Sequence, residues 1–311
     1  MLTQFIIEGQ TEIEIPVPDE NSSFPPSSAA VFYNPAMRLN RDIAVAAVAC
    51  FSKSDPDYTY LDALSASGIR GLRIAKEVGL CTAMSDWEDE SFNLIVKNIK
   101  HSGLSNCTVI KRNANVVMLD SSFDIIDLDP FGSPAPFLDA ASRSVKRLLC
   151  ITATDTAPLC GAHKKAGIRN YAAAPLKTEY HPEMGVRILL GAVARTLARH
   201  DKAMFPLLSY ASAHYVRIFA GIKKGIKDAD ACLTNIGFVS HCFNCGSRDW
   251  KEGFAVHMEE KCRVCGLSMS FGGPLWLGRL HDSDFCKEVL KEAKNRGFTK
   301  AEKLLEACRD E

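Results

Sequence analysis

Short apolar runs alternate with amphipathic stretches through the middle of the chain. The apolar runs are rich in Ile, Val and Leu and end in Gly, Pro or Asp, as buried strands do, and the stretches between them have helical periodicity. Strands are predicted at 58–64, 80–85, 107–111, 123–128 and 147–153, and helices at 69–78, 88–102 and 135–146. Because strands that alternate with helices form parallel sheets covered on both faces, we predict an α/β fold with right-handed crossovers.

The same criteria extend the prediction to both ends of the chain. The further elements are a hairpin at 8–18, a packed helix at 37–51, a helix at 186–200, an antiparallel strand pair at 204–210 and 215–222 on the sheet edge, and helices at 283–295 and 299–308. We divide the chain into residues 1–230, an N-terminal extension with the main α/β domain, and residues 231–311, a smaller C-terminal domain.

The strand predicted at 123–128 carries carboxylates and ends abruptly at Asp129, Pro130 and Phe131. In open α/β sheets, ligands lie beyond the carboxyl ends of the strands. A carboxylate, a rigid turn and an aromatic face at that place are suited to hold a flat base that bears an amino group. Asp127 and Asp129 point to the same face of the strand, so the spacing leaves open which of them accepts a proton. We favour Asp129 because it adjoins the turn.

Polar residues also accompany the first three strands of the α/β domain. A short loop of small residues and a helix with Arg70 form an opening suited to a nucleotide. Asp86 ends the second strand, where a carboxylate commonly binds ribose hydroxyls, although it could equally cap the next helix. Asn113 and Ala114 follow the third strand, where an adenine edge is commonly bound. Arg41 and Arg70 can each bind a carboxylate through two hydrogen bonds. These groups together suit a ligand with adenine, ribose and an amino-acid carboxylate.

Four of the twelve cysteines form two Cys-x-x-Cys pairs, Cys242 with Cys245 and Cys262 with Cys265. This spacing predicts a structural Zn²⁺ site, because four thiolates fill a tetrahedral coordination shell and leave no open position. The sequence has neither a signal peptide nor an apolar run of membrane-spanning length. We therefore expect a cytoplasmic protein whose cysteines bind metal or lie buried instead of forming disulfides.

Several stretches, in this order, resemble the S-adenosylmethionine-dependent tRNA guanine-26 N2-dimethyltransferases of the archaeal type. They are Phe-Tyr-Asn-Pro at 32–35, Asn-Arg-Asp at 40–42, Ser-Gly-Ile-Arg-Gly at 67–71, Asp-Leu-Asp-Pro-Phe-Gly-Ser-Pro at 127–134, the segment 152–161 and Pro-Leu-Lys-Thr-Glu-Tyr at 175–180. The resemblance covers most of the chain. It implies a class I methyltransferase domain with a Rossmann-like sheet, a smaller zinc-binding C-terminal domain, and dimethylation of the guanine between the D and anticodon stems of tRNA.

The resemblance also implies roles for single residues. The methyl donor would contact Arg41, Arg70, Asp86, Asn113 and Ala114. Asp129 would face the guanine amino group, Pro130 would present its carbonyl, and the flipped base would stack between Phe131 and Phe32. Where the family pattern has Asp-Ala this chain has Asn113-Ala114, and Asn can still accept a hydrogen bond from the adenine amino group. The chain stops at Glu311, earlier than the archaeal relatives that it resembles, so we expect part of their C-terminal domain to be missing.

Formal charge totals zero, yet its distribution is uneven. Residues 141–230 hold fifteen basic and six acidic side chains, which is typical of a phosphate-facing surface, although an ordinary solvated face has the same composition. The expected contacts with the tRNA backbone are Lys164, Lys165, Arg169, Arg187, Arg195, Arg199, Arg217, Lys223, Lys224 and Lys227. We expect tRNA as the partner, with no membrane and no obligate protein partner.

Two other functions are weighed against this one. Asp129-Pro130-Phe131 also resembles the Asp/Asn-Pro-Pro-aromatic loop of adenine N6 and other nucleic-acid amino methyltransferases. A zinc-ribbon RNA-binding protein with a catalytically inactive methyltransferase fold is the non-enzymatic alternative. The guanine and adenine methyltransferases both require that the protein bind S-adenosylmethionine, whereas the inactive RNA-binding protein does not.

Overall fold

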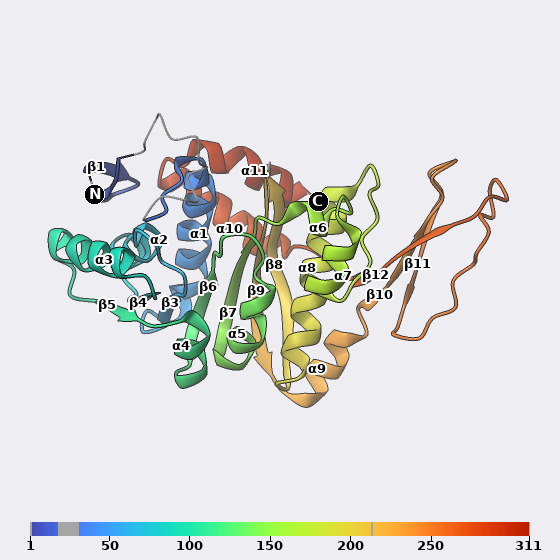
Figure 1. Cartoon of the computed structure of the whole chain (residues 1–311), viewed down its shortest axis with the longest axis horizontal. Helices are drawn as coiled ribbons and strands as arrows, with labels where there is room; N and C mark the ends of the chain where they lie inside the picture. Colours follow the sequence, from blue (N-terminus) through green and yellow to red (C-terminus); the bar gives the residue numbers. More distant parts are fainter. Residues whose placement is uncertain (1, 18–30, 213, 311) are drawn as a thin grey trace. The chain divides into compact units, whose positions relative to one another are not determined.

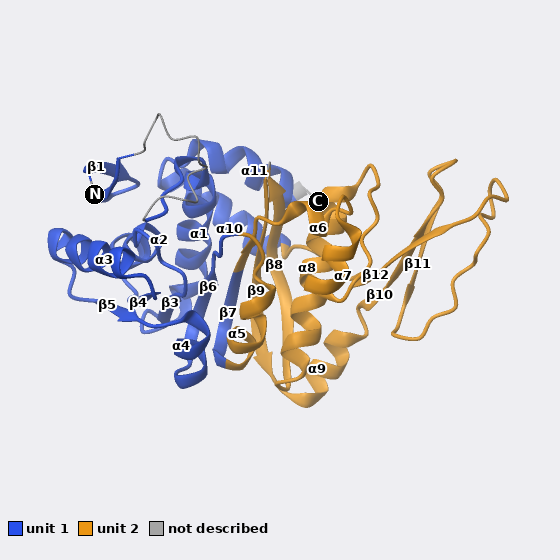
Figure 2. Cartoon of the chain, in the orientation of Figure 1, with its two compact units in different colours: residues 1–131, 144–150, 283–311 blue, residues 132–143, 151–282 orange. Residues whose placement is uncertain are grey.

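The contacts within the chain divide it into two compact units. A computed structural model describes residues 2–17, 31–212 and 214–310. Figure 2 shows unit 1, residues 1–131, 144–150 and 283–311, and unit 2, residues 132–143 and 151–282. A grouping by contacts does not test which stretches fold independently, so the domain boundary expected after residue 230 stays a prediction.

Unit 1 is built on parallel strands. They are β3 (Thr59–Asp62), β4 (Cys81–Asp86), β5 (Cys107–Lys111), β6 (Phe123–Leu128) and the first part of β7 (Val145–Ala153), in the spatial order β5-β4-β3-β6-β7 (Figure 1). β3 pairs in parallel with both β4 and β6, and this register places Asp62 beside Asp127 at the carboxyl ends of β3 and β6. The prediction of an α/β fold with a mostly parallel sheet is confirmed.

Six α-helices are described in unit 1. They are α1 (Arg38–Phe51), α2 (Ile69–Arg73), α3 (Asp89–Ser102), α4 (Ala114–Asp120), α10 (Ser283–Asn295) and α11 (Thr299–Asp310). α10 packs against α1 and α11, so the two last helices of the chain belong to unit 1. α4 was not predicted, although α5, which has the same length, was.

Unit 1 includes an N-terminal hairpin, but it spans residues 3–16 and not the predicted residues 8–18, so the prediction missed most of its first strand. β1 (Thr3–Glu8) pairs antiparallel with β2 (Thr11–Pro16). Ile13 and Ile15 of β2 are buried in a cluster with Ile69, Leu72 and Met84. Because these residues come from β2, α2 and β4, the apolar cluster fixes the hairpin to the strand-and-helix layers.

Unit 2 contains most of α5 and the end of β7, followed by an antiparallel strand pair at the edge of the seven-stranded sheet and by a separate three-stranded sheet. Its elements are α5 (Leu138–Ser144), α6 (Thr156–Leu159), α7 (Lys164–Tyr171), α8 (His181–Ala198), β8 (Lys202–Ser212), β9 (Tyr215–Lys224), α9 (Ile226–Leu233), β10 (Ile236–His241), β11 (Arg248–Glu252) and β12 (Ser270–Trp276). β8 and β9 form the predicted antiparallel edge pair, in the order β7-β9-β8. β10, β11 and β12 form a separate three-stranded sheet. No helix in the described part of the chain is both long and apolar enough to cross a membrane.

Candidate active site

One buried arginine joins the carboxylates at the end of β6. Arg70 of α2 donates from Nη2 to Asp129 and, over 2.9 Å, to Oδ1 of Asn40. Its Nη1 lies 3.6 Å from Oδ2 of Asp127 and makes no hydrogen bond to the described residues. Although burial opposes it, the charges of Asp127 and Asp129 hold the pKa of Arg70 well above its ordinary value, so the guanidinium stays charged. Arg70 therefore holds both carboxylates and keeps one buried N–H donor unsatisfied.

The two carboxylates of β6 differ in exposure. The side chain of Asp129 is 20% exposed, whereas that of Asp127 is wholly buried. Asp127 also accepts a hydrogen bond of 3.0 Å from the hydroxyl of Tyr60. Burial and the charge of Asp127 raise the pKa of Tyr60, so its phenol remains a donor. Of this pair, Asp129 is the carboxylate that a ligand can reach.

Asp62, at the end of β3, is a third carboxylate of this cluster, and the sequence reasoning missed it. Its Oδ2 accepts a hydrogen bond of 3.0 Å from the backbone N–H of Gly71. Burial raises the pKa of Asp62 to about 7, although the charge of Arg70 opposes the shift. The signal was present in the sequence, because Asp62 follows a buried apolar run as Asp127 does on β6.

Arg41 of α1 is held by a carboxylate from the hairpin. Its Nε donates to Oε1 of Glu8 over 2.6 Å, and its Nη2 donates to Oε2 of Glu8 over 2.7 Å. Nη2 also donates to the backbone carbonyl of Asn34 over 3.1 Å. Glu8 was not recognised as a site residue from the sequence, because nothing in the local pattern connects it to Arg41.

The other expected donor-binding residues line the ends of β4 and β5. Oδ2 of Asp86 accepts from the backbone N–H of Ala66 over 2.9 Å, and Oδ1 accepts from that of Glu88 over 3.1 Å. Asp86 therefore fixes the loop after β3 to the start of α3. Asn113 caps α4 by accepting from the N–H of Asn115, and Ala114 is buried as the first residue of that helix. Asp86 and Asn113 thus have local structural roles in addition to any contact with a ligand.

Two aromatic side chains lie together beyond the end of β6. The rings of Phe32 and Phe131 are 5.0 Å apart and meet edge to face. Phe131 is 67% exposed, which is unusual for so large an apolar side chain, and Phe32 is half-buried. Pro130, between Asp129 and Phe131, is buried. The structure thus brings the exposed aromatic face and the reachable carboxylate of Asp129 to one turn of the chain.

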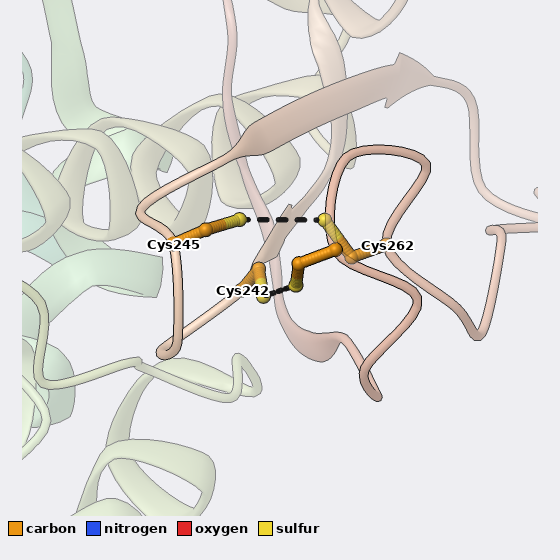
Figure 3. Close-up of side chains that lie close together, drawn as sticks. Cys242, Cys245 and Cys262 are labelled. Carbon is orange, nitrogen blue, oxygen red and sulfur yellow. Dashed lines mark hydrogen bonds between the residues drawn. The ribbon is translucent and has the colours of Figure 1, made fainter.

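The four cysteines of the paired motifs converge on one point of unit 2. All four Sγ atoms lie within 4.8 Å of one another, with 3.4 Å between Cys242 and Cys265 and 3.6 Å between Cys245 and Cys262. Figure 3 shows Cys245 and Cys262 pointing toward each other from two separate loops. Four sulfurs bound to one Zn²⁺ would be about 3.8 Å apart, given Zn–S bonds of about 2.3 Å in a tetrahedron. The cluster fits a structural Zn²⁺.

Each cysteine pair is followed by the same turn. The glycine after each pair, Gly246 or Gly266, donates its N–H to the carbonyl of the first cysteine and has a positive φ that favours glycine. Backbone N–H groups of Cys265 and Val264 donate to the thiolate of Cys262 and lower its pKa to about 6. This backbone arrangement favours the thiolate form, which is the form that binds zinc.

The structure corrects the expected set of tRNA-backbone contacts. Arg217 is wholly buried and donates to Oγ1 of Thr152 over 2.9 Å, so the prediction of a phosphate contact there is wrong. Arg187 and Arg195 of α8 donate to backbone carbonyls of residues 274, 276 and 278, in and just after β12. These two arginines tie α8 to β12. The exposed members of the predicted set are Lys164, Lys165, Arg169, Arg199, Lys223, Lys224 and Lys227.

The sheet has parallel strands with helices between them, and polar side chains lie at the carboxyl ends of those strands. This arrangement defines an α/β protein of the methyltransferase class. A family model described as N2,N2-dimethylguanosine tRNA methyltransferase matches residues 9–311, so the chain belongs to that family. The family that the sequence motifs indicated is thereby confirmed.

Relatives and a solved structure agree with this assignment. A tRNA (guanine(26)-N(2))-dimethyltransferase of Methanosarcina barkeri is 51% identical over 323 residues, which cover 100% of this chain and 83% of that protein. The enzyme of the same name from Methanosphaerula palustris is 46% identical and covers 98% of this chain and 82% of its own length. The structure of Trm1 from Pyrococcus horikoshii with S-adenosyl-L-methionine is 34% identical, has a TM-score of 0.86 and covers 99% of this chain and 83% of that one.

Proposed function

We propose that this protein transfers methyl groups from S-adenosylmethionine to the exocyclic N2 of guanine 26 in tRNA, giving N2-methylguanosine and then N2,N2-dimethylguanosine. The observation that carries the proposal is the reachable carboxylate of Asp129, beside the exposed ring of Phe131 at the carboxyl end of β6. The relatives named as guanine-26 dimethyltransferases support the choice of substrate. The first of them is 51% identical and its match covers all of this chain, so the adenine and inactive alternatives are less favoured.

Asp129 takes the proton in this proposal. The lone pair of the guanine amine is delocalised into the ring, so the nitrogen is a weak nucleophile until an N–H proton is accepted. S-adenosylmethionine supplies the methyl group as a sulfonium electrophile. Asp129 accepts a hydrogen bond from one N–H of the amine and then its proton, and the backbone carbonyl of Pro130 accepts a hydrogen bond from the other N–H. General-base assistance of this kind contributes about 10²- to 10⁴-fold, and the alignment of the two reactants about 7–11 kcal/mol.

The donor-binding residues are proposed from the family motif and from the unsatisfied groups of the site. Arg70 keeps a buried Nη1 without a hydrogen bond to the described residues, and a ligand acceptor would satisfy it. Arg41 and Arg70 would bind the donor's carboxylate, and Asp86 its ribose hydroxyls. Asn113 and Ala114 would contact adenine. The side-chain oxygen of Asn113 accepts one hydrogen bond at the start of α4, and its second lone pair could accept another from the adenine amino group.

The base would be held between Phe32 and Phe131. Guanine 26 lies within stacked helices, so it has to be flipped out, at a cost of a few kcal/mol that aromatic stacking partly restores. The two rings meet edge to face with 5.0 Å between their centroids, which leaves no room for a base between them. We infer that one ring turns when guanine enters, and the exposed Phe131 is the freer of the two.

The exposed basic residues of unit 2 would bind the tRNA backbone. Lys164, Lys165 and Arg169 lie on α7, and Lys223, Lys224 and Lys227 lie around the turn between β9 and α9. We further propose a cytoplasmic location and no requirement for a protein partner, in keeping with a tRNA substrate.

Methylation of tRNA transcripts tests the proposal directly. The protein is given S-adenosylmethionine and a transcript with guanine or adenine at position 26, and the modified nucleoside is identified by mass. We expect N2-methyl- and N2,N2-dimethylguanosine from the guanine transcript alone. N6-methyladenosine would identify the adenine enzyme, and RNA binding without any donor binding would identify the inactive protein.

A further inference from the structure

Glu8 carries a carboxylate from the end of β1 into the interior of unit 1. It is 1% exposed, and an unpaired carboxylate in such a place would be very costly. It accepts two hydrogen bonds from Arg41, one of 2.9 Å from Nη1 of Arg73 and one of 3.1 Å from the hydroxyl of Tyr33. Burial opposes ionisation, but Arg41 and Arg73 together hold the pKa of Glu8 below its ordinary value. Glu8 is therefore a charged, fully paired group.

The two arginines depend on Glu8 to different degrees. Arg73 also pairs with Asp42 over 2.7 Å and with Glu77 over 2.8 Å. Among the described residues, Glu8 is the sole carboxylate that pairs with Arg41. If Glu8 were lost, Asp42 and Glu77 would still neutralise Arg73. Arg41 would lose the carboxylate that fixes both its Nε and its Nη2.

The hairpin holds Glu8 in a fixed place. The side chain of Asn98 on α3 accepts from the N–H of Glu14 over 2.8 Å and donates to its carbonyl over 2.9 Å, as a neighbouring strand would. At the other end of β2, Oε1 of Glu77 accepts from the N–H of Gln10 and from Oγ1 of Thr11. A Cβ on Gly9 would come within 2.7 Å of side-chain atoms of Arg73 and Glu77, so the turn is closely packed.

Arg41 has one nitrogen left for a ligand. Nε and Nη2 face Glu8, and the described residues provide no acceptor for Nη1. We propose that Glu8 is a positioning residue of the methyl-donor site, which holds Arg41 in the orientation that binds the donor's carboxylate. The inference rests on the proposed function, since it takes Arg41 as a donor ligand. It makes the N-terminal hairpin a working part of the active site.

Two ligands separate this role from a purely structural one. S-adenosylmethionine has the amino-acid carboxylate, and 5′-methylthioadenosine has the same adenosine and sulfur without it. Their Kd values are measured by calorimetry for the full chain and for Glu8→Gln, Glu8→Asp and Glu77→Gln. The last variant is the matched control, because Glu77 pairs with Arg73 and does not contact Arg41, and the side-chain oxygen of Gln can still accept from Gln10 and Thr11 and so keep the turn in place. Glu8→Asp keeps the charge and shortens its reach, in case Glu8→Gln does not fold.

We expect both Glu8 variants to bind S-adenosylmethionine about tenfold more weakly or worse, because Arg41 would lose the charged hydrogen-bond partner that orients it. Their affinity for 5′-methylthioadenosine should change less than twofold, and Glu77→Gln should bind both ligands as the unaltered protein does. An equal loss for both ligands, or an unchanged affinity for S-adenosylmethionine, would overturn the inference. Failure of the unaltered protein to bind S-adenosylmethionine would overturn the proposed function itself.

Discussion

Arg70 donates a hydrogen bond to Asp129 through the same nitrogen that donates to Asn40. The carboxylate expected to accept a proton is thus fixed in place by a cation expected to bind the methyl donor. The two halves of the proposed site, donor and base, are connected through one guanidinium.

The first prediction concerns Asp129. Because an amide cannot accept a proton, Asp129→Asn should lower the rate of methyl transfer by about 10²- to 10⁴-fold. The affinities for S-adenosylmethionine and for tRNA should change only a few-fold. Single-turnover methylation and calorimetry measure the two effects. Asp124→Asn is the control, because Asp124 lies at the other end of β6 and bonds to Thr59. Equal turnover in Asp129→Asn and in the unaltered protein would refute the assigned role.

The second prediction follows from the raised pKa of Asp62. Its ordinary value is 3.8 and its value in the fold is about 7, so between these pH values the folded chain holds a proton that the unfolded chain has released. The contribution of Asp62 to stability therefore falls as pH rises through that window, by about 1.4 kcal/mol per pH unit at most. Asp62→Asn removes this dependence, and its carbonyl oxygen can still accept from Gly71.

Urea unfolding at pH 5, 6 and 7 measures that dependence. Relative to the unaltered protein, Asp62→Asn should become steadily more stable across the series. A difference in unfolding free energy that stays constant over these pH values would show that Asp62 is already ionised at pH 5.

Local patterns were enough to predict the strands from β3 to β9 and the cysteine cluster, but not β1 or the three-stranded sheet. Each of the parallel strands predicted in unit 1 is a short apolar run with a clear end, and the four cysteines belong to two short loops whose spacing alone implies the ligand set. Arg70 was reached from the short loop and helix that carry it, and Asp129 from the end of its strand, and the family motifs agreed with both. All of these signals lie within a few neighbouring residues.

Interactions between distant residues could not be read in that way. Glu8 meets Arg41 across 33 positions of the chain, and neither residue has a local pattern that names the other. Arg217 was misjudged for a related reason, because a count of charges over a segment does not show which of them are buried. Arg217 lies in Val216–Phe219, a stretch of β9 that is buried on both faces.

The third prediction concerns the exposed ring of Phe131. Stacking on one base is worth about 1–3 kcal/mol, so Phe131→Ala should lower kcat/KM for tRNA by about 5- to 150-fold. The melting temperature should hardly change, because the ring is mostly exposed. Phe131→Tyr should retain activity, since it keeps the aromatic face. Phe5→Ala is the control, being an exposed aromatic on β1. An unchanged kcat/KM in Phe131→Ala would exclude a stacking role.

The fourth prediction separates the zinc site from the donor site. We expect one Zn²⁺ per chain by elemental analysis, and none in a Cys242→Ser, Cys262→Ser double variant. Loss of the metal should expose residues 242–269 to proteolysis, because thiolate coordination holds the two loops together. Binding of S-adenosylmethionine should persist, since all the proposed donor contacts lie in unit 1 and the four cysteines in unit 2. Loss of donor binding together with the metal would contradict this separation.

The fifth prediction concerns the basic surface of α7. Lys164 and Lys165 are exposed at the start of this helix, where they would oppose its dipole, so stability does not require them. If both contact phosphates, the variant Lys164→Ala, Lys165→Ala should raise KM for tRNA and leave kcat nearly unchanged. The logarithm of the tRNA-binding constant falls linearly with the logarithm of the salt concentration. The slope of that line should become shallower by about 1.4–1.8, since each phosphate contact contributes about 0.7–0.9 to it. Lys287→Ala, Lys291→Ala on α10 is the matched control. An equal salt slope in both double variants would place the tRNA backbone elsewhere.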